Sequence, residues 1–405
     1  MVLGAWLVAS SPLRALGNVV PGARLRFSAA YLALAPYCDV MDALTLLSVN
    51  QHVALLSTVI AGYALWRWRR HSAGGGWRRG SAPGACGRAA AMLTAIAAIY
   101  ALGATGPRPM AALALADAQS LAIDFHSHTD ASWDGRRGFT ADDNRAWHRD
   151  AGFDVSYISD HGTISAATGA LASNPRRSGD GTIILTAAEV RCEGQHVIVL
   201  GATARDTAED CDPSHSPMAT HERPEDADGR VALLAIPGNL ANGRPLPAVQ
   251  GLEIADGAPR ALDQMRRDER LLRHVADSAG LARLSGSNNH GWGRTAAAWS
   301  VMSIAAWRTM SPESLDVAIR REIVRAPRTA VQVIERRRAV PGASPLELVV
   351  TAPVVAWTML VTLSPAERLA WLCWIWTTWA CVAIRRGARA GTTSSASRPS
   401  RDRAA

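Results

Sequence analysis

The stretch "LAIDFHSHTDASWDG", residues 121–135, places two histidines directly after an apolar run that is typical of a β-strand. Alternate side chains of a strand point to the same face, so His126 and His128 face the same way. Two imidazoles on one face, with carboxylates close behind, suit a divalent metal ion. A pair of surface histidines at a strand end is the ordinary alternative. The rest of the chain has to decide between the two.

The basic charge of the chain comes from arginine alone. The formal net charge is +8, with 43 basic residues and no lysine. Much of the arginine flanks apolar segments, where membrane topology accounts for it. We therefore do not favour a nucleic-acid partner, although a basic face for one stays open. The six cysteines form no C-x-x-C pair, which removes the support for a zinc ribbon or a thioredoxin-like site.

Apolar segments gather at the two ends of the chain. A transmembrane helix needs about 20 mostly apolar residues. We expect a membrane region over residues 1–117 and a transmembrane hairpin over 345–384, followed by a disordered basic tail over 385–405. The N-terminal spans are expected at about 28–48, 49–66 and 89–106. The first of these is the weakest, because Asp39 and Asp42 are costly in lipid unless they face protein.

The two flanks of the central region disagree about topology. The arginine-rich loop 67–88 favours the cytoplasm, and a span at 89–106 then places the following domain outside it. Arginines on both sides of the C-terminal hairpin favour the opposite side. Long domains are translocated largely regardless of charge, so we expect a multi-pass membrane protein with an extracytoplasmic domain. Cys192 and Cys211 could pair there, but we expect two free thiols.

The pattern changes over residues 118–338, where short β-branched runs alternate with polar, helix-like stretches. Seven strands are expected, at "LAIDF", "DVSYIS", "TIILTAAEV", "HVIVLGA", "VALLAIP", "GLEIAD" and "ARLSGS". Between the first two, Thr140 and Gly152 suit the N-cap and C-terminal cap of a helix. Strands that alternate with helices predict βα units around a parallel sheet or barrel, and the length suits a barrel.

Side chains that bind metals fall at the ends of these strands. In chain order they are His126, His128, Asp160, His161, Glu189, His196 and His290. The carboxyl ends of parallel barrel strands form one face, where active sites lie. We therefore expect these residues to converge on one pocket, which a chance placement at strand ends would not achieve.

Several of these pieces, in order, resemble the PHP (polymerase and histidinol phosphatase) superfamily of metal-dependent phosphoesterases. They are "DFHSHTDASWDG", "YISDHG", "AAEVRCEGQHVIVLGA", "LAIPG", "GLEIADG" and "GSNNHGWG", and they cover roughly residues 121–301. The resemblance implies an α/β fold, a distorted (β/α)7 barrel, here flanked by transmembrane helices. It also implies two or three divalent ions, commonly Zn²⁺, Mn²⁺ or Fe.

The resemblance assigns the ligands residue by residue. His126 and His128 bind one metal, and Glu189 bridges it to a second. The second metal is also bound by His196, and a third is held by Asp134, His161 and His290. Asp130 competes with Asp134, since "ASWDG" is one residue longer than the usual spacing.

Two positions depart from the family pattern. Ile236 stands where the family has a histidine, and it cannot bind a metal. Asn288 stands where the family has an aspartate, and its neutral amide is a weaker ligand for hard cations. We keep Asn288 in the expected ligand set. His215 or His221 could replace the lost histidine.

Such a site suits hydrolysis of a phosphate mono- or diester, because metal ions activate water and bind phosphoryl oxygens. Arg294, in "GWGRT", is the candidate catalytic clamp, with a structural arginine as the equal alternative. Asp124 either supports the histidines or packs in the core, and we expect His148 on the surface.

Two other functions remain open. A binding or sensor module on a degenerate barrel would explain Ile236 and Asn288. A transporter or scaffold is disfavoured by the few spans and the lack of a repeat. The sequence specifies neither the class of phosphorylated substrate, nor the metal, nor the oligomeric state.

Overall fold

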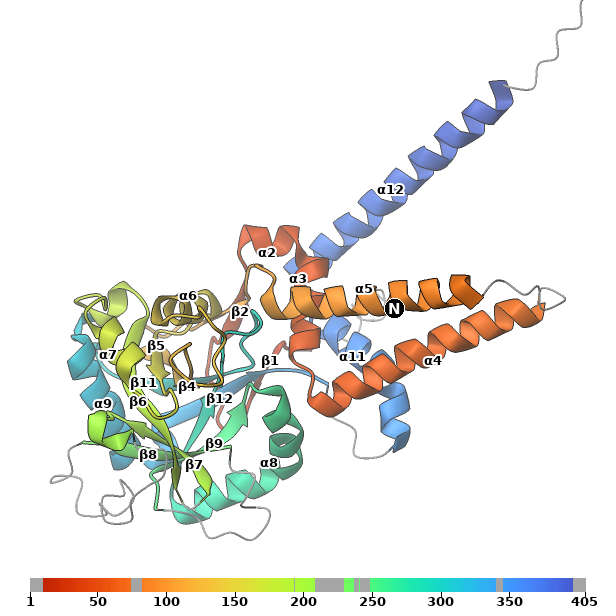
Figure 1. Cartoon of the computed structure of the whole chain (residues 1–405). Helices are drawn as coiled ribbons and strands as arrows, with labels where there is room; N and C mark the ends of the chain where they lie inside the picture. Colours follow the sequence, from red (N-terminus) through yellow and green to blue (C-terminus); the bar gives the residue numbers. More distant parts are fainter. Residues whose placement is uncertain are drawn as a thin grey trace, which may run out of the picture.

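A computed structural model describes residues 10–73, 82–192, 194–207, 229–236, 240, 248–339 and 345–395. In this part of the chain an α/β domain carries long helices that project from it (Figure 1). Three residues named above, Cys211, His215 and His221, lie outside the described residues.

A ten-stranded mixed sheet forms the body of the domain. Its order is β1-β12-β11-β4-β5-β6-β7-β8-β9-β10. The strands are β1 (Leu13–Ala15), β4 (Ser120–Ser127), β5 (Val155–Ile158), β6 (Ile183–Cys192), β7 (Gln195–Leu200), β8 (Val231–Ala235), β9 (Gly251–Asp256), β10 (Ala282–Gly286), β11 (Ala298–Ser303) and β12 (Val331–Arg336). Each of the seven expected strands is present, as β4 to β10.

The sheet curls until the residues after β10 meet the end of β4. The backbone N–H of Asn288 donates to the carbonyl of His126 at 2.8 Å, and that of His128 donates to Asn289 at 2.9 Å. We call this junction the seam. The first strand to carry candidate ligands and the last one therefore lie side by side.

The sheet is not the all-parallel barrel that the alternating pattern predicts. Only β4-β5-β6 and β8-β9-β10 are parallel. Strand β7 is antiparallel to both neighbours, because a connection of two residues after Cys192 permits a hairpin and is too short for a parallel crossover. Strands β11, β12 and β1 continue the sheet in antiparallel pairs beyond β4.

Helices cover the outside of the sheet (Figure 1). They are α6 (Ala141–Ala151), α7 (Ser165–Leu171), α8 (Pro259–Ala279), α9 (Pro312–Arg325) and the single turn α10 (Pro327–Ala330). Helix α6 has the expected caps: Thr140 and Asp143 form a capping box, and Gly152 has φ 83°. The interior is apolar, and Trp299 and Trp307 are among its largest fully buried side chains.

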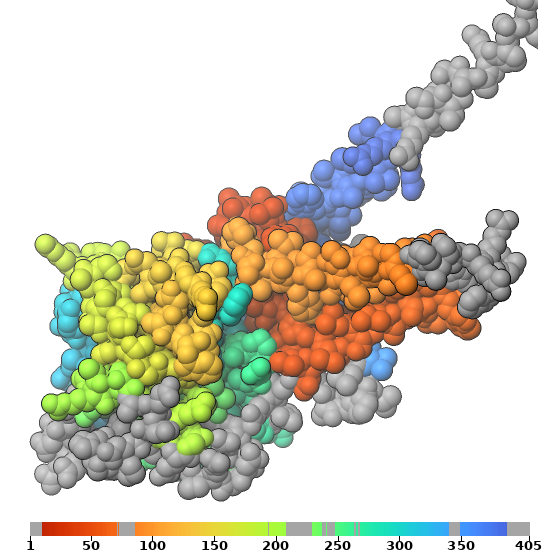
Figure 2. All heavy atoms as spheres, in the orientation of Figure 1, coloured from red at the N-terminus to blue at the C-terminus, as the bar shows by residue number. Residues whose placement is uncertain are grey.

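The N-terminal segment adds a two-stranded sheet and four helices. They are β2 (Arg24–Arg26), β3 (Ala112–Ala114), α2 (Ala29–Ala33), α3 (Ala35–Thr45), α4 (Val49–Ala73) and α5 (Ala82–Thr105). Helices α4 and α5 extend from the domain (Figure 2), and His52 of one contacts the hydroxyl of Tyr100 of the other at 2.9 Å. At the other end of the chain, α11 (Pro345–Thr362) precedes α12 (Pro365–Ser395).

One described helix, Cys86–Thr105, is long and apolar enough to cross a membrane. Two bent pairs pass the same test only if each counts as one span: 35–45 with 49–70, and 349–362 with 365–386. The second pair covers most of the expected C-terminal hairpin, and its two helices are bent by 113° at the break between them. Helix α12 also runs on to Ser395, through the first part of the tail that we expected to be disordered; alanine and arginine in this part favour helix.

The segment 28–48 is not one span. It forms α2 and α3, which are both too short to cross a bilayer. The reason is that Asp42 is buried and paired with other residues of the protein. Its carboxylate accepts hydrogen bonds from Arg108 at 2.9 Å, Thr295 at 2.7 Å and Arg336 at 2.6 Å. Helix α3 is therefore docked on the α/β domain by a buried ionic network.

The two cysteines of the central region were expected as free thiols. Cys192 is instead disulfide-bonded, so that expectation is wrong for this residue.

Asp42→Ala should destabilise the folded chain by about 3–5 kcal/mol, because the substitution leaves two arginines buried without their carboxylate. Thermal unfolding of the detergent-solubilised protein measures the change. Asp142→Ala is the control: it removes an exposed carboxylate paired with Arg145 and should change little. Equal unfolding temperatures for the two variants would contradict the docking of α3 through Asp42.

Candidate metal centre

The two histidines at the end of β4 face each other in the interior. His126 and His128 are buried, and their Nε2 atoms lie 3.1 Å apart. Glu189, on β6, places Oε2 3.1 Å from the first Nε2 and 3.2 Å from the second. Three potential ligand atoms from two strands thus converge on one point, as the sequence predicts.

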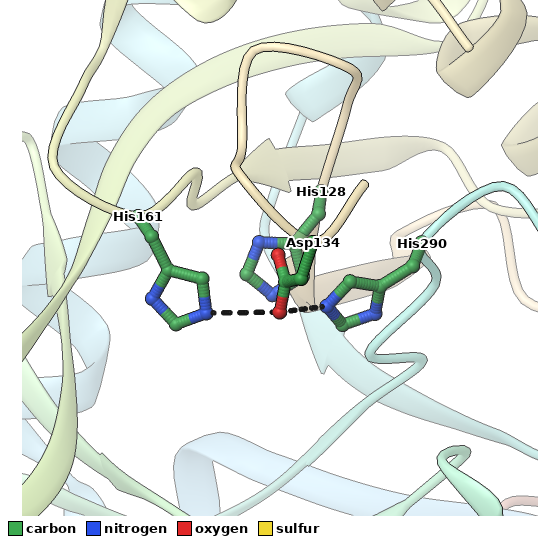
Figure 3. Close-up of side chains that lie close together, drawn as sticks. All are labelled: His128, Asp134, His161 and His290. Carbon is green, nitrogen blue, oxygen red and sulfur yellow. Dashed lines mark hydrogen bonds and ion pairs between the residues drawn. The ribbon is translucent and has the colours of Figure 1, made fainter. Parts of the chain in front are cut away.

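A second group of ligands adjoins the first and shares His128 with it. It consists of His128, Asp134, His161 and His290 (Figure 3). Asp134 Oδ2 lies 3.4 Å from Nε2 of His161 and 3.0 Å from Nε2 of His290. Asp130, the alternative to Asp134, is exposed and accepts a hydrogen bond from the backbone of Gly138.

The hairpin between β6 and β7 brings in His196. Since β7 runs antiparallel to β6, its first residues lie at the same edge of the sheet as the last residues of β6. His196 Nδ1 contacts Oε1 of Glu189, while Oε2 of the same carboxylate faces His126 and His128. Glu189 therefore lies between two sets of imidazoles, in a bridging position.

The two positions that depart from the family pattern both adopt positive φ angles, 43° at Ile236 and 46° at Asn288. The backbone N–H of Ile236 donates to Glu253, and the Asn288 amide donates to Asp256 at 3.1 Å. The amide oxygen of Asn288 is buried and has no hydrogen-bond partner. An oxygen ligand is thus still present at this position, while Ile236 contributes none.

Two acids of β9 also belong to the site, although the sequence pattern does not indicate them. Glu253 and Asp256 are three residues apart, so a regular strand would point them to opposite faces. The pairing of β9 with β10 slips by one residue between them, a bulge that turns both toward His126. Glu253 Oε1 lies 3.4 Å from His126 Nδ1, the nitrogen that points away from Glu189. A carboxylate in this place orients a ligating imidazole.

A buried pair of side chains, His148 and Asp124, also stabilises the seam. His148 was expected on the surface, yet it is fully buried and its Nε2 lies 2.6 Å from Oδ2 of Asp124. Asp124 Oδ1 accepts the backbone N–H groups of His126 and Ser287, one on each side of the seam. The sequence held one indication of this burial. His148 lies four residues after Asn144, so both side chains are on the same face of α6, and both are buried.

The ionisable side chains of the site shift one another's pKa values and so determine the charge of each. Burial alone would raise the pKa of the Glu189 carboxyl, but His126 and the surrounding imidazoles hold that pKa well below its usual range. Burial would lower the pKa of His126, but Glu189 and Glu253 raise it well above the ordinary value. Burial lowers the pKa of His128 to about 4. At neutral pH and without metal, Glu189 is therefore a carboxylate, His126 an imidazolium and His128 a neutral imidazole.

The residues fit divalent metal ions. Imidazole nitrogens and carboxylate oxygens are the donors that Zn²⁺, Mn²⁺ and Fe share. The Nδ1 atom of His128 is buried without a hydrogen-bond partner. The Nε2 atoms of His126 and His128 and Oε2 of Glu189 converge on one point, an arrangement that suits a cation bound between them.

Arg294 does not lie with these side chains in the described structure. Its guanidinium pairs with Asp150 at 2.6 Å and donates to the carbonyl of Arg108 at 3.0 Å. Both contacts fasten the loop after His290 to neighbouring segments. The geometry gives Arg294 a structural role and supplies no support for a catalytic one.

No family model and no curated protein matches the chain. Among solved structures it is similar to PsfC from Pseudomonas syringae, with 15% identity over 58% of this chain and 97% of that one and a TM-score of 0.35. It is also similar to a protein described as a metal-dependent phosphoesterase from Bifidobacterium adolescentis (16%, 49% and 96%, TM-score 0.29). A third is a lesion-specific endonuclease from Pyrococcus furiosus (14%, 51% and 56%, TM-score 0.34). At these scores the chemistry of the site rests on its own residues.

Metal affinity should rise with pH. A metal ion competes with the proton of His126, whose raised pKa keeps it protonated at neutral pH, so affinity should grow about tenfold per pH unit for this proton. His128 adds a further loss only near and below its lower pKa. Competition with a chromophoric chelator between about pH 6 and pH 8 measures the slope. A flat profile would show that no protonated ligand has to be displaced.

Proposed function

We propose that this chain is a membrane-anchored, metal-dependent phosphoesterase that hydrolyses a phosphate mono- or diester. The observation that carries the proposal is the position of Glu189, whose two oxygens face imidazoles from the end of β4, the turn after β5 and strand β7. Together with the adjoining group around Asp134, it offers ligands for two or three divalent ions, as in the PHP superfamily. The finer fold assignment, a PHP-type barrel, belongs to the same proposal and is supported by the curled sheet and its seam.

Bound divalent ions would supply Lewis acidity and an activated water for attack on phosphorus. The chain contributes the remaining parts. His126 is held by Glu253, so its Nε2 is aimed at the site. Glu189 supplies a buried negative charge that offsets the charge of the cations. Asp134, His161 and His290 line the more exposed side, where a substrate can enter.

The membrane part of the proposal rests on helix composition. The helix Cys86–Thr105 has only 6% of its apolar window buried inside the protein, so most of its apolar side chains are not covered by the described part of the chain. We infer that it anchors the domain, with the bent pairs as further membrane contacts. The disulfide at Cys192 suits an oxidising compartment and supports an extracytoplasmic domain.

A binding or sensor module is the second candidate. Ile236 favours it, because one ligand position of the family carries a side chain that cannot bind metal. In that case the site would bind metal and phosphate without turnover.

The metal content of the full-length protein in detergent is the first test. We expect two or more divalent ions per chain by elemental mass spectrometry, and loss of most of them in a His126→Ala/His128→Ala variant. His274→Ala, an exposed histidine on α8, is the matched control and should keep the parent's content. A folded parent without metal under replete conditions would sink the enzyme proposal.

Activity separates the two candidates. Glu189→Gln keeps the shape of the side chain and removes its charge, so hydrolysis of p-nitrophenyl phosphate or bis-p-nitrophenyl phosphate should fall at least about a hundredfold. The two substrates distinguish monoesterase from diesterase activity. A metal-loaded parent that hydrolyses neither these nor a broader panel of phosphoesters would favour the sensor.

A further inference from the structure

One arginine at the edge of the candidate metal centre pairs with no acceptor in the part of the chain that the structure describes. Arg136 follows Asp134 by two residues, in the loop between β4 and α6. Its side chain is half-buried, and its Nε atom is buried without a hydrogen-bond partner. Among the residues that the structure describes, no carboxylate or carbonyl is paired with its guanidinium.

The backbone of Arg136 is nonetheless fixed to the site. Its N–H donates to the carbonyl of His290 at 2.9 Å, and its carbonyl accepts the N–H of Phe139 at 3.0 Å. Asp134 and His290 themselves lie 3.0 Å apart through their side chains. Arg136 is therefore tied to two candidate ligands, one along the chain and one across space.

Two aromatic rings hold the guanidinium. Its central carbon lies 5.6 Å from the ring centroid of Phe139 and 6.0 Å from that of Trp292. Aromatic faces attract a cation but use none of its N–H donors. The donors of the guanidinium thus remain free for an anion, while its position is restricted.

The other arginines nearby differ from Arg136 in this respect. Arg294 is occupied by Asp150 and by the carbonyl of Arg108. Arg137 is exposed, and its side chain makes no described contact that would hold it. Arg136 alone among these three is both held in place and without an anionic partner.

We propose that Arg136 is the phosphate-binding arginine of this site. It donates to non-bridging phosphoryl oxygens of the substrate, on the side lined by Asp134 and His290. This inference rests on the proposed function and assigns to Arg136 the clamp that the sequence had suggested for Arg294. A guanidinium suits the task because its N–H groups match two phosphate oxygens, and its charge stabilises the negative charge of the transition state.

The test uses full-length, metal-loaded protein with inorganic phosphate as the probe. Arg136→Met keeps the apolar stem between the two rings and removes the charge. We expect phosphate to bind about ten to a hundred times more weakly to this variant, as for the loss of a charge-assisted hydrogen bond. Arg136→Lys should recover part of the affinity. Arg137→Met, one residue away, should bind phosphate as the parent does.

Metal content is measured on every variant, so the two proposals fail in different ways. Equal phosphate affinity of Arg136→Met and Arg137→Met, with metal retained, would overturn the role of Arg136. Loss of metal from Arg136→Met would overturn it too, and would assign this arginine to the integrity of the loop. A parent without metal would defeat the proposed function. In that case the phosphate affinities of the metal-free parent and of Arg136→Met would still be compared, and equal values would overturn the role of Arg136.

Discussion

A carboxylate that is removed from water needs positive charge or several donors around it, and Glu189 obtains both from histidines. Its cost of burial is offset only while strands β4 and β7 and the turn after β5 keep their imidazoles in place around β6, which carries Glu189. This requirement fixes the register between these strands. A shift of one residue in any of them would turn a histidine to the opposite face of the sheet. The arrangement of the site and the register of the sheet therefore depend on the same contacts.

Much of the fold was readable from periodicity and from turn chemistry. All seven strands and the capped helix α6 form where the pattern indicates. The direction of β7 was not predicted. The alternation of strands and helices suggested a parallel crossover, whereas the short connection after Cys192 requires an antiparallel hairpin. Local sequence patterns thus indicate whether a segment is a strand or a helix, whereas the length of the connection between two strands indicates whether they run parallel or antiparallel.

The ligands were predicted more completely than the groups that support them. His126, His128, Glu189 and His196 lie together, as strand-end positions suggest. The contributions of Glu253 and His148 escaped notice because they depend on a bulge and on helix packing, which are tertiary features. Arg136 escaped for a similar reason, since its role follows from the two rings beside it and from the absence of an acceptor within reach in the described structure.

The helices at the N-terminus are not merely attached to the domain. The loop that follows His290 donates from Gly293 to the carbonyl of Ala104, in the last turn of α5, and from Thr295 to Asp42 of α3. The composition of the segment 28–48 predicts a membrane span, yet its Asp42 makes this contact with the loop. The candidate anchor and the candidate site thus share one loop.

The seam has a consequence for biosynthesis. His126 emerges from the ribosome early and His290 late, and β10 must fold back on β4 before the two can approach. Until then the early histidines lack their final neighbours, and the candidate site is incomplete. Under the proposed function, metal loading would accordingly be one of the last steps in the maturation of this chain, and a truncated product that ends before β10 would lack a complete centre.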